Sequence, residues 1–472
     1  MTIRFETDAP TLQAAFQDAL DRLRLNVRTI APYAAPVLIE GAEYQGAWLE
    51  CAPLEGLIYA PVDAQIALNN HRIFFDHQRE DGYIPCWLMP DRIGAAQIQM
   101  VVPIAASALE LYQQIADRAF LEQAYTACQR WDSWLAQYRD TRATGLCEAF
   151  CEYDTGHDNS PRFAGLPHAC PDKDARRCSQ EGGLPYLAPD LSATVYGGRV
   201  ALAQMADLLG LKDEAQAWRE RAEQTRRALL AYTFDPETLC FYDLDRDNRW
   251  VRIRGDALTR VLSEHVVDQR LFEQIYARQI RNPQAFWTPY PLPSIAADDP
   301  TFVGEIPRNS WGGAAQALTA LRAPRWFEYY GKGNDLDHLM RQWLKALLHA
   351  YEQGTRWRQQ MNPFTGEFTV GAEGYSPAML VMLDFTARLY GVRREGRRLI
   401  WTIQRPDGGA ACQYTLDDQP GRFQLTTTED AATLAFDGTI KLTARGDCRV
   451  ITDLSGKVIS VTPLSNQPIM VV

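Results

Sequence analysis

The sequence lacks the features that mark several large classes of protein. No segment approaches the roughly 18 uncharged apolar residues that a membrane span needs. The stretch from Met1 to Leu20 is charged and amphipathic, without the apolar run and cleavage site of a secretory signal. There is no run of Lys or Arg, and the formal net charge of −11 does not suit a surface that displaces counterions from nucleic acid. We therefore expect a cytoplasmic protein without nucleic-acid or membrane partners.

Cysteine and histidine are present, but not at the spacings of metal or redox motifs. The ten cysteines include no CxxC pair, and the seven histidines do not fall at metal-ligand spacing. Cys170 and Cys178 bracket the polar loop PDKDARR, and spacing alone leaves open whether they form a disulfide, share a metal or stay as free thiols. We expect no cofactor and no catalytic metal.

Motifs of several other enzyme classes are also missing. The chain has no GxSxG elbow, no Walker loop and no GxGxxG segment after a strand. A serine hydrolase of the α/β type, a P-loop enzyme and a dinucleotide-binding enzyme are therefore not indicated.

Amphipathic helices that come in pairs are the main feature that the sequence does contain. Apolar residues recur at offsets of three and four within 121–138, directly after an expected helix over 98–117. The same pattern runs through 195–209 and again through 215–229, with Gly210 as the stop between them. With weaker segments included, about eleven helices are expected, close to the twelve of six helical hairpins.

Long polar loops separate the pairs, and a different pattern follows them. Segments 41–58, 140–189, 282–310 and 354–374 are rich in Pro, Gly, Trp and acidic residues, and loops of this length in a compact domain are usually functional. We interpret them as the walls of a binding cleft.

After Arg393 the chain shows seven or eight alternating segments separated by turn signals such as PDGG and FDG. The sequence thus predicts a mainly α domain over residues 1–393 and a small accessory β-sandwich without catalytic residues over 394–472.

The densest set of reactive side chains is the segment 152–163, EYDTGHDNSPRF. It carries three carboxylates, a histidine and an arginine, and Gly156 and Pro161 keep it from forming a helix. The side chains can therefore converge on a cleft. A hydrogen-bonded loop in which Asp158 caps a turn would also explain the pattern.

A family resemblance begins in this segment. Residues 158–162, Asp-Asn-Ser-Pro-Arg, resemble the acid motif of the α/α-barrel glycoside hydrolases of families 37 and 63, which include trehalases, processing α-glucosidases and mannosylglycerate hydrolases. Further segments resemble blocks of those enzymes in the same order along about 350 residues: Trp48-Leu-Glu50, Gln78 to Pro85, Pro189 to Ala193, Arg308 to Gly313 and Asn362 to Glu367.

The resemblance implies an (α/α)6 barrel and an inverting glycosidase, with Asp158 as the general acid. Inversion needs a protonated carboxyl on one side of the scissile bond and a carboxylate about 6.5–9.5 Å away that activates water. The acid also needs a raised pKa, which the neighbouring Glu152 or Asp154 could provide. The matched and Pro-rich segments supply the candidate sugar-binding residues, which are Trp48, Glu50, Asn159, Arg162, Asp190, Trp287, Arg308, Trp311, Gln359 and Gln360. For Asp190, capping of the helix that starts at Pro189 is an equal alternative.

The second carboxylate departs from the family pattern. The family has Glu where this chain has Gln359, and an amide cannot accept the proton of an attacking water. Glu367 is the preferred substitute, followed by Glu373, with Glu50 or no base as the remaining options.

Two functions are therefore considered. The first is an inverting, exo-acting glycosidase that cleaves a small α-linked glycoside. The second is a non-hydrolytic α/α-barrel protein, either a sugar binder or an epimerase or lyase, which the amide of Gln359 favours. A small carbohydrate is the expected partner in both.

Overall fold

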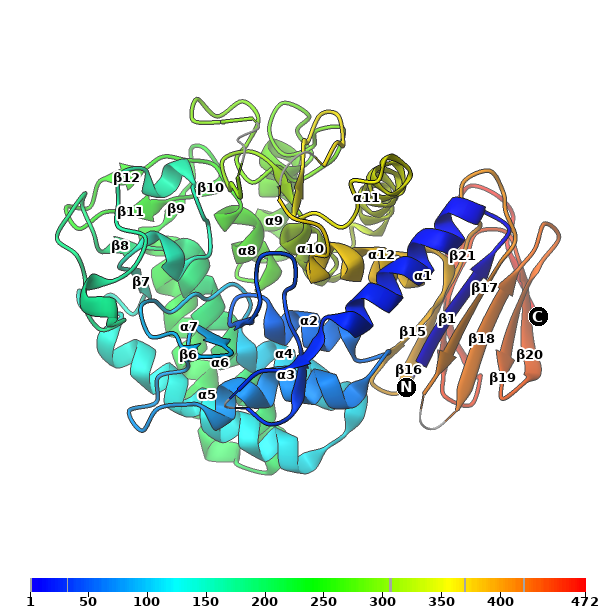
Figure 1. Ribbon diagram of the computed structural model, residues 1–472, viewed down its shortest axis with the longest axis horizontal. Helices are drawn as coiled ribbons and strands as arrows, with labels where there is room; N and C mark the ends of the chain where they lie inside the picture. The colour runs from blue at the N-terminus through cyan, green and yellow to red at the C-terminus, as the bar shows by residue number, and fades with distance from the viewer. Residues whose placement is uncertain (1, 32, 305–307, 369–370, 419–420) are drawn as a thin grey trace.

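The computed structural model describes residues 2–31, 33–304, 308–368, 371–418 and 421–472. The α-helices of this part of the chain all lie before residue 391 (Figure 1). Its twelve α-helices are α1 Pro10–Leu25, α2 Ala52–Tyr59, α3 Ala64–Asp76, α4 Ile104–Ile115, α5 Arg118–Tyr138, α6 Pro189–Leu209, α7 Lys212–Tyr232, α8 Ala257–Ser263, α9 Gln269–Ile275, α10 Ala317–Tyr329, α11 Gly333–Gln353 and α12 Ser376–Tyr390.

The even-numbered helices form a closed ring. Each of α2, α4, α6, α8, α10 and α12 contacts the next, and α12 contacts α2. Odd-numbered helices pack outside this ring, with α1 and α11 against α12, α5 against α4 and α6, and α7 against α6. The segments that lead into the even-numbered helices contact one another, as when Trp311 N donates to Asp158 O and Ser376 N to Glu40 O. The N-terminal ends of the ring helices therefore meet in one region, where the candidate site lies.

The predicted helix pairs are confirmed, with one shifted start. Gly210 ends α6 in the left-handed conformation, and the adjacent α7 follows after Leu211. The expected helix over 98–117 is α4, which begins only at Ile104. Gln99 has a φ of 44°, and Pro103 is the N-cap, so the preceding residues cannot extend the helix.

Two other predictions are corrected by the structure. The expected loop 41–58 contains α2, whose residues are almost all buried, so that no polar face reveals its period. The helix expected near 311–321 begins at Ala317, because Gly313 has a φ of 151° and Ala315–Gln316 form a short strand, β13, paired with β14, Gln360–Met361.

Two antiparallel sheets follow the helices. The six-stranded sheet has the order β1-β17-β18-β19-β20-β23, and the four-stranded sheet has the order β15-β16-β21-β22. The strands are β1 Thr2–Thr7, β15 Val392–Glu395, β16 Arg398–Ile403, β17 Cys412–Asp417, β18 Arg422–Thr427, β19 Ala432–Phe436, β20 Thr439–Arg445, β21 Cys448–Asp453, β22 Val458–Pro463 and β23 Met470–Val471. Trp401 of one sheet packs on Phe423 and Phe436 of the other, as expected for facing apolar sides.

The N-terminal strand joins the C-terminal strands. β1 pairs with β17 along its whole length, and its Ile3 and Phe5 are buried. The expected division at residue 393 therefore differs from the observed arrangement at both ends, since residues 2–7 belong to the sheets and β15 already starts at Val392. Short strands also occur in the loops between helices: β2 Val27–Thr29, β3 Pro36–Leu38, β4 Ala47–Trp48, β5 Trp87–Met89, β6 Arg92–Ile93, β7 Glu148–Ala149, β8 Tyr186–Leu187, β9 Phe234–Asp235, β10 Cys240–Phe241, β11 Asp243–Leu244 and β12 Trp250–Val251.

No helix in the described ranges is long and apolar enough to cross a bilayer. All ten cysteines are free, so the structure contains no Cys170–Cys178 disulfide. Cys170 instead contacts Cys151, with the two sulfur atoms 3.7 Å apart.

Candidate active site

Asp158 lies between two other acidic residues and is partly exposed. Its side chain accepts a hydrogen bond of 2.9 Å from the Asn309 amide. Burial, then the charges of Glu50 and Glu152, raise its pKa well above the ordinary value. A raised pKa is what the sequence predicts for a general acid, although Glu50 contributes more than the neighbouring Glu152.

Glu50 is the second partly exposed carboxylate of this site. It follows β4 and immediately precedes α2, and its Oε2 accepts a hydrogen bond of 3.0 Å from Gln99. Burial is the largest effect and raises the pKa of Glu50 above its ordinary value, whereas the Gln99 hydrogen bond and the positive charges of Arg260 and Arg322 partly oppose this rise.

The environments of these two carboxyls differ in one decisive respect. Glu50 is influenced by two guanidinium groups, whereas among the described residues the charge of Asp158 is stabilised by the neutral amide of Asn309. When Glu50 ionises, its negative charge further disfavours ionisation of Asp158. The pair therefore favours a charged Glu50 beside a protonated Asp158, which is the division of roles that acid and base catalysis requires.

More acidic groups lie behind Glu50. Glu40 and Glu55 are buried, and burial followed by the charge of Glu50 raises the pKa of both well above the ordinary value. Neither oxygen of Glu55 has a hydrogen-bond partner among the described residues. Burial and the charge of Glu50 therefore favour the protonated form of both carboxyls.

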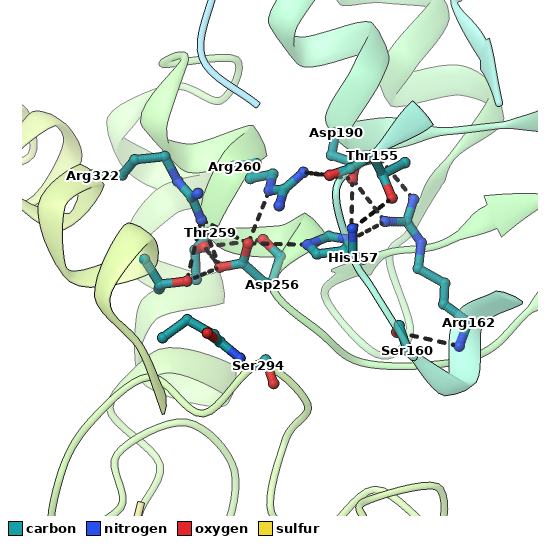
Figure 2. A network of polar contacts seen from close by, with 12 residues as sticks. Thr155, His157, Ser160, Arg162, Asp190, Asp256, Thr259, Arg260, Ser294 and Arg322 are labelled. Carbon is teal, nitrogen blue, oxygen red and sulfur yellow. Dashed lines mark hydrogen bonds and ion pairs between the residues drawn. The ribbon is translucent and has the colours of Figure 1, made fainter. Parts of the chain in front are cut away.

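A buried charge network supports the loop that carries Asp158, and Figure 2 shows its centre. Three arginines and three aspartates form it, namely Arg162, Arg260, Arg322, Asp190, Asp243 and Asp256, and all of them are at most 5% exposed. Arg162 donates to both oxygens of Asp190, at 2.7 Å each, and to both oxygens of Asp243. Asp256 accepts from Arg260 at 2.9 Å and from Arg322 at 2.7 Å. Equal numbers of opposite charges compensate one another inside the ring of helices.

His157 connects the two halves of the network. Its Nδ1 lies 2.9 Å from Arg162, and its Nε2 lies 3.2 Å from Asp256 (Figure 2). Burial and the nearby arginines lower its pKa to about 3, so the ring is neutral. Because a guanidinium can only donate, Nδ1 accepts and Nε2–H donates to Asp256. Together with the bond from Arg260 to Thr155 O, this fixes the residues on the N-terminal side of Asp158.

Arg162 and Asp190, both predicted sugar-binding residues, thus bind each other. Their side chains are 4% and 1% exposed. Asp190 lies in the first turn of α6 but makes no capping hydrogen bond, so the alternative of capping is not observed. Both residues therefore belong to the charge network that stabilises the loop carrying Asp158.

Asp154 has a similar supporting role, which differs from the expectation that its charge acts on Asp158. Its carboxylate accepts hydrogen bonds from Arg139 and from the backbone amides of Ile98, Phe150 and Cys151. It thereby ties the loop before α4 to the loop before Asp158.

Gln359 and Gln360 are buried, and both side-chain amides are hydrogen-bonded. The Oε1 of Gln359 accepts a hydrogen bond of 3.1 Å from the Tyr44 hydroxyl. The Oε1 of Gln360 accepts from Ser310 N and from the Gln316 amide. After burial, nearby carboxylate charges raise the pKa of Tyr44, and those of Asp158 and Glu50 are among them. Tyr44 therefore lies near both carboxyls, and its hydrogen bond places the Gln359 amide near them as well.

The two preferred base candidates are more exposed than Glu50. Glu367 and Glu373 are both exposed, and the Glu367 carboxylate accepts from the hydroxyl of Thr365 within its own turn. Glu50 is the candidate that the structure brings next to Asp158.

The predicted aromatic residues divide into two groups. Trp48 is half-buried and packs on Tyr44, with ring centroids 5.7 Å apart. Trp311 is buried against His157. Trp287 instead packs on Phe327 and His338 and has a packing role between α10 and α11.

Arg308 and Asn159 are the two remaining predicted sugar-binding residues, and both are close to Asn309. Arg308 is exposed, and its positive charge acts to lower the pKa of Tyr153, which burial raises. Asn159 is partly exposed, has a φ of 57°, and donates to Asn309 O at 2.7 Å.

Several residues of the site were not identified from the sequence. Arg260 and Arg322 each stand inside an otherwise apolar helical stretch, and a charge there requires a buried partner, which is a usable signal. Tyr44, Gln99 and Glu40 carry no such signal.

Two groups of described residues have the composition of a cation site. Cys151, Asp154 and Cys170 form one, and Glu40, Glu50 and Cys51 the other, each with ligand atoms within 4.8 Å of one another. The hydrogen bonds from Arg139 and three amides already engage Asp154. In the second group, burial and the charge of Glu50 raise the pKa of Glu40 and favour a proton on that carboxyl.

Comparison with solved structures shows which class of protein has this fold. A GH63 mannosylglycerate hydrolase from Thermus thermophilus superposes with a TM-score of 0.65 at 19% identity, covering 79% of this chain and all of that one. Neutral trehalase Nth1 from Saccharomyces cerevisiae gives 0.58 at 13% identity, covering 74% and 73%. A GH78 rhamnosidase from a Bacillus species gives 0.64 at 12% identity, covering 90% of this chain and 40% of the other. The fold is that of glycoside hydrolases.

The family follows from the sequence match. The family model described as the mannosylglycerate hydrolase MGH1-like glycoside hydrolase domain matches residues 44–377. The chain belongs to this family and carries a glycoside hydrolase domain. The resemblance to families 37 and 63 noted in the sequence is thereby confirmed.

Proposed function

We propose that the protein is an inverting glycosidase that acts on a small α-linked glycoside, with Asp158 as general acid and Glu50 as general base. In this proposal the ring of helices is an (α/α)6 barrel, and the two sheets form a β-sandwich that supplies no catalytic group. The observation that carries the proposal is the unequal environment of two neighbouring, partly exposed carboxyls.

The reaction is written as a single displacement. Asp158 donates its proton to the glycosidic oxygen while the bond from that oxygen to the anomeric carbon breaks. A water molecule attacks the same carbon from the opposite face and loses a proton to Glu50. The products are the free sugar with inverted configuration and the released alcohol. Proton exchange with solvent then restores both carboxyls.

Three features support Glu50 as the base. It is partly exposed and therefore reachable by water, Arg260 and Arg322 favour its charged form, and Gln99 orients one of its oxygens. Gln359, at the family position of the base, keeps the site polar and holds the Tyr44 hydroxyl instead. In the proposal Gln359, Gln360, Trp48, Trp311, Asn159 and Arg308 contact the sugar or its leaving group.

The family and the solved relatives support the substrate class that we propose. Structures of the Thermus enzyme contain glucose in one case and D-glycerate with Tris in another. A short polar glycoside, such as a hexose linked to a small hydroxy acid or to a second sugar, is therefore the first class to test.

The test is incubation with aryl α-glycosides, α-linked disaccharides and mannosylglycerate, followed by proton NMR from the first minutes. Release of the β-anomer from an α-glycoside supports an inverting glycosidase. Release of the α-anomer contradicts inversion. Binding without turnover of any substrate favours the non-hydrolytic alternative, for which the amide of Gln359 is the specific observation.

A further inference from the structure

A second cavity lies at the opposite end of the ring of helices. It has a volume of about 560 Å³ and lies between the helices and both sheets, since Ile3, Tyr414 and Leu416 of the six-stranded sheet also line it. Its walls come from α2, the C-terminal halves of α4, α10 and α12, and the hairpin of β15 and β16. In Figure 1 this hairpin lies on the side of the sheets nearest to the helices. None of the lining residues belongs to the candidate active site.

The size and floor of this cavity suit a small organic molecule. Ligand sites in proteins typically have volumes of about 300–1,000 Å³. The floor is apolar and includes Leu54, Leu57, Ile58, Leu321 and Leu383.

The hairpin that borders the cavity is unusually basic for this acidic chain. The sequence Arg393-Arg-Glu-Gly-Arg-Arg398 places four arginines in six residues, all of which line the cavity, together with Arg325 and Arg388. Five carboxylates share the lining, namely Glu110, Glu328, Asp384, Glu395 and Asp418. Six arginines therefore face five acids.

The carboxylates are not distributed evenly over the arginines. Arg325 binds Glu110, and Arg388 binds Asp384 and Glu328. Arg393 binds Glu328, and Arg394 binds Asp418.

Arg397 and Arg398, at and just after the turn of the hairpin, are exposed and have no side-chain partner in the described residues. The other four arginines are held in ion pairs, whereas these two retain free donor groups.

We infer that this cavity binds a small organic anion whose phosphate or carboxylate group is held by Arg397 and Arg398 and whose body rests on the apolar floor. The planar guanidinium fork matches both kinds of oxyanion. The inference stands independently of the proposed hydrolase activity, because it concerns binding at a separate place.

The test is isothermal titration of the full chain, in buffer with about 150 mM chloride, with inorganic phosphate, a hexose phosphate and benzoate. The variant Arg397→Ser/Arg398→Ser removes the free guanidinium groups from an exposed turn. The control Arg28→Ser/Arg270→Ser removes two exposed arginines elsewhere, so both variants change the net charge equally.

We expect saturable binding of at least one probe, with a dissociation constant at least tenfold higher in the hairpin variant and unchanged in the control. Binding of phosphate alone identifies a simple oxyanion site, whereas tighter binding of an organic probe shows that the floor contributes. The inference is overturned if no probe binds, or if the two double variants bind as the unaltered chain does.

Discussion

The side-chain amide of Asn309 donates a hydrogen bond of 2.9 Å to the carboxylate of Asp158. This bond favours the ionised carboxylate, so it limits how far burial and the charges of Glu50 and Glu152 raise the pKa of Asp158. Asn309 thus adjusts the pH range in which Asp158 retains a proton.

The first prediction concerns this bond. Replacing Asn309 by Ala removes the donor, so the pKa of Asp158 rises further. Because the acid must be protonated, the alkaline limb of the pH profile of kcat/KM is expected to move to higher pH. The measurement is that profile for both proteins. An alkaline limb that stays in place or moves to lower pH contradicts the assignment of Asp158 as acid.

The second prediction is that Asp158→Asn lowers kcat by about 10²–10⁴-fold, since general acid catalysis typically contributes that factor. The loss is expected to be largest for alkyl leaving groups and smallest for a nitrophenyl leaving group, which needs little protonation. Equal losses for both leaving groups would show that Asp158 has another role. Circular dichroism is the control for the fold.

The third prediction concerns the buried charge network. Arg162→Ala leaves Asp190 and Asp243 without their bidentate partner, which is expected to cost about 3–5 kcal/mol of the free energy of unfolding. Arg176→Ala, at an exposed pair with Asp174, is the matched control and is expected to cost no more than about 1 kcal/mol. Urea denaturation measures both. Similar values for the two variants would contradict the supporting role of Arg162.

The fourth prediction follows from the unpartnered carboxyl of Glu55. Its pKa in the folded chain is raised well above the ordinary 4.5 by burial and by Glu50, so between these values the folded state binds one more proton than the unfolded state. Stability therefore falls as pH rises above 4.5, by up to about 1.4 kcal/mol per pH unit for one group.

Glu55→Gln removes this proton binding while keeping the shape of the side chain. The variant is expected to gain stability relative to the unaltered chain as the pH rises from about 5 to about 8, measured as the difference in unfolding free energy across that range. The exposed Glu43→Gln is the control. A constant difference across the range would show that Glu55 is already charged.

The helices and strands were largely predictable because their apolar residues follow regular periods. The pair over 195–209 and 215–229 shows a helical period, and Gly210 marks the boundary. Helix α2 was not predictable, because a helix buried on all sides shows no period. The pairing of β1 with β17 joins the two ends of the chain, and no local signal in residues 2–7 identifies that partner.

The candidate site was predictable only where a short motif carries it. Asp158 stands in such a motif, and its raised pKa agrees with the expectation. The charged form of Glu50 is favoured by Gln99, Arg260 and Arg322, which come from three distant segments. Arg162 belongs to the motif, but it binds Asp190 and Asp243, because the ring of helices brings them together in the interior. The position of Arg162 close to Asp158 in the sequence therefore did not show whether its side chain contacts a substrate or stabilises the loop.

The most direct test of the account compares Glu50→Gln with Glu367→Gln and Glu373→Gln on a glycosyl fluoride, with and without azide. The account predicts that Glu50→Gln lowers kcat by about 10²–10⁴-fold and that azide restores turnover and yields a glycosyl azide. The other two variants are expected to stay within about twofold of the unaltered chain, since in the proposal neither exposed carboxylate acts as the base. Full activity of Glu50→Gln, or azide rescue of Glu367→Gln or Glu373→Gln instead, would contradict it.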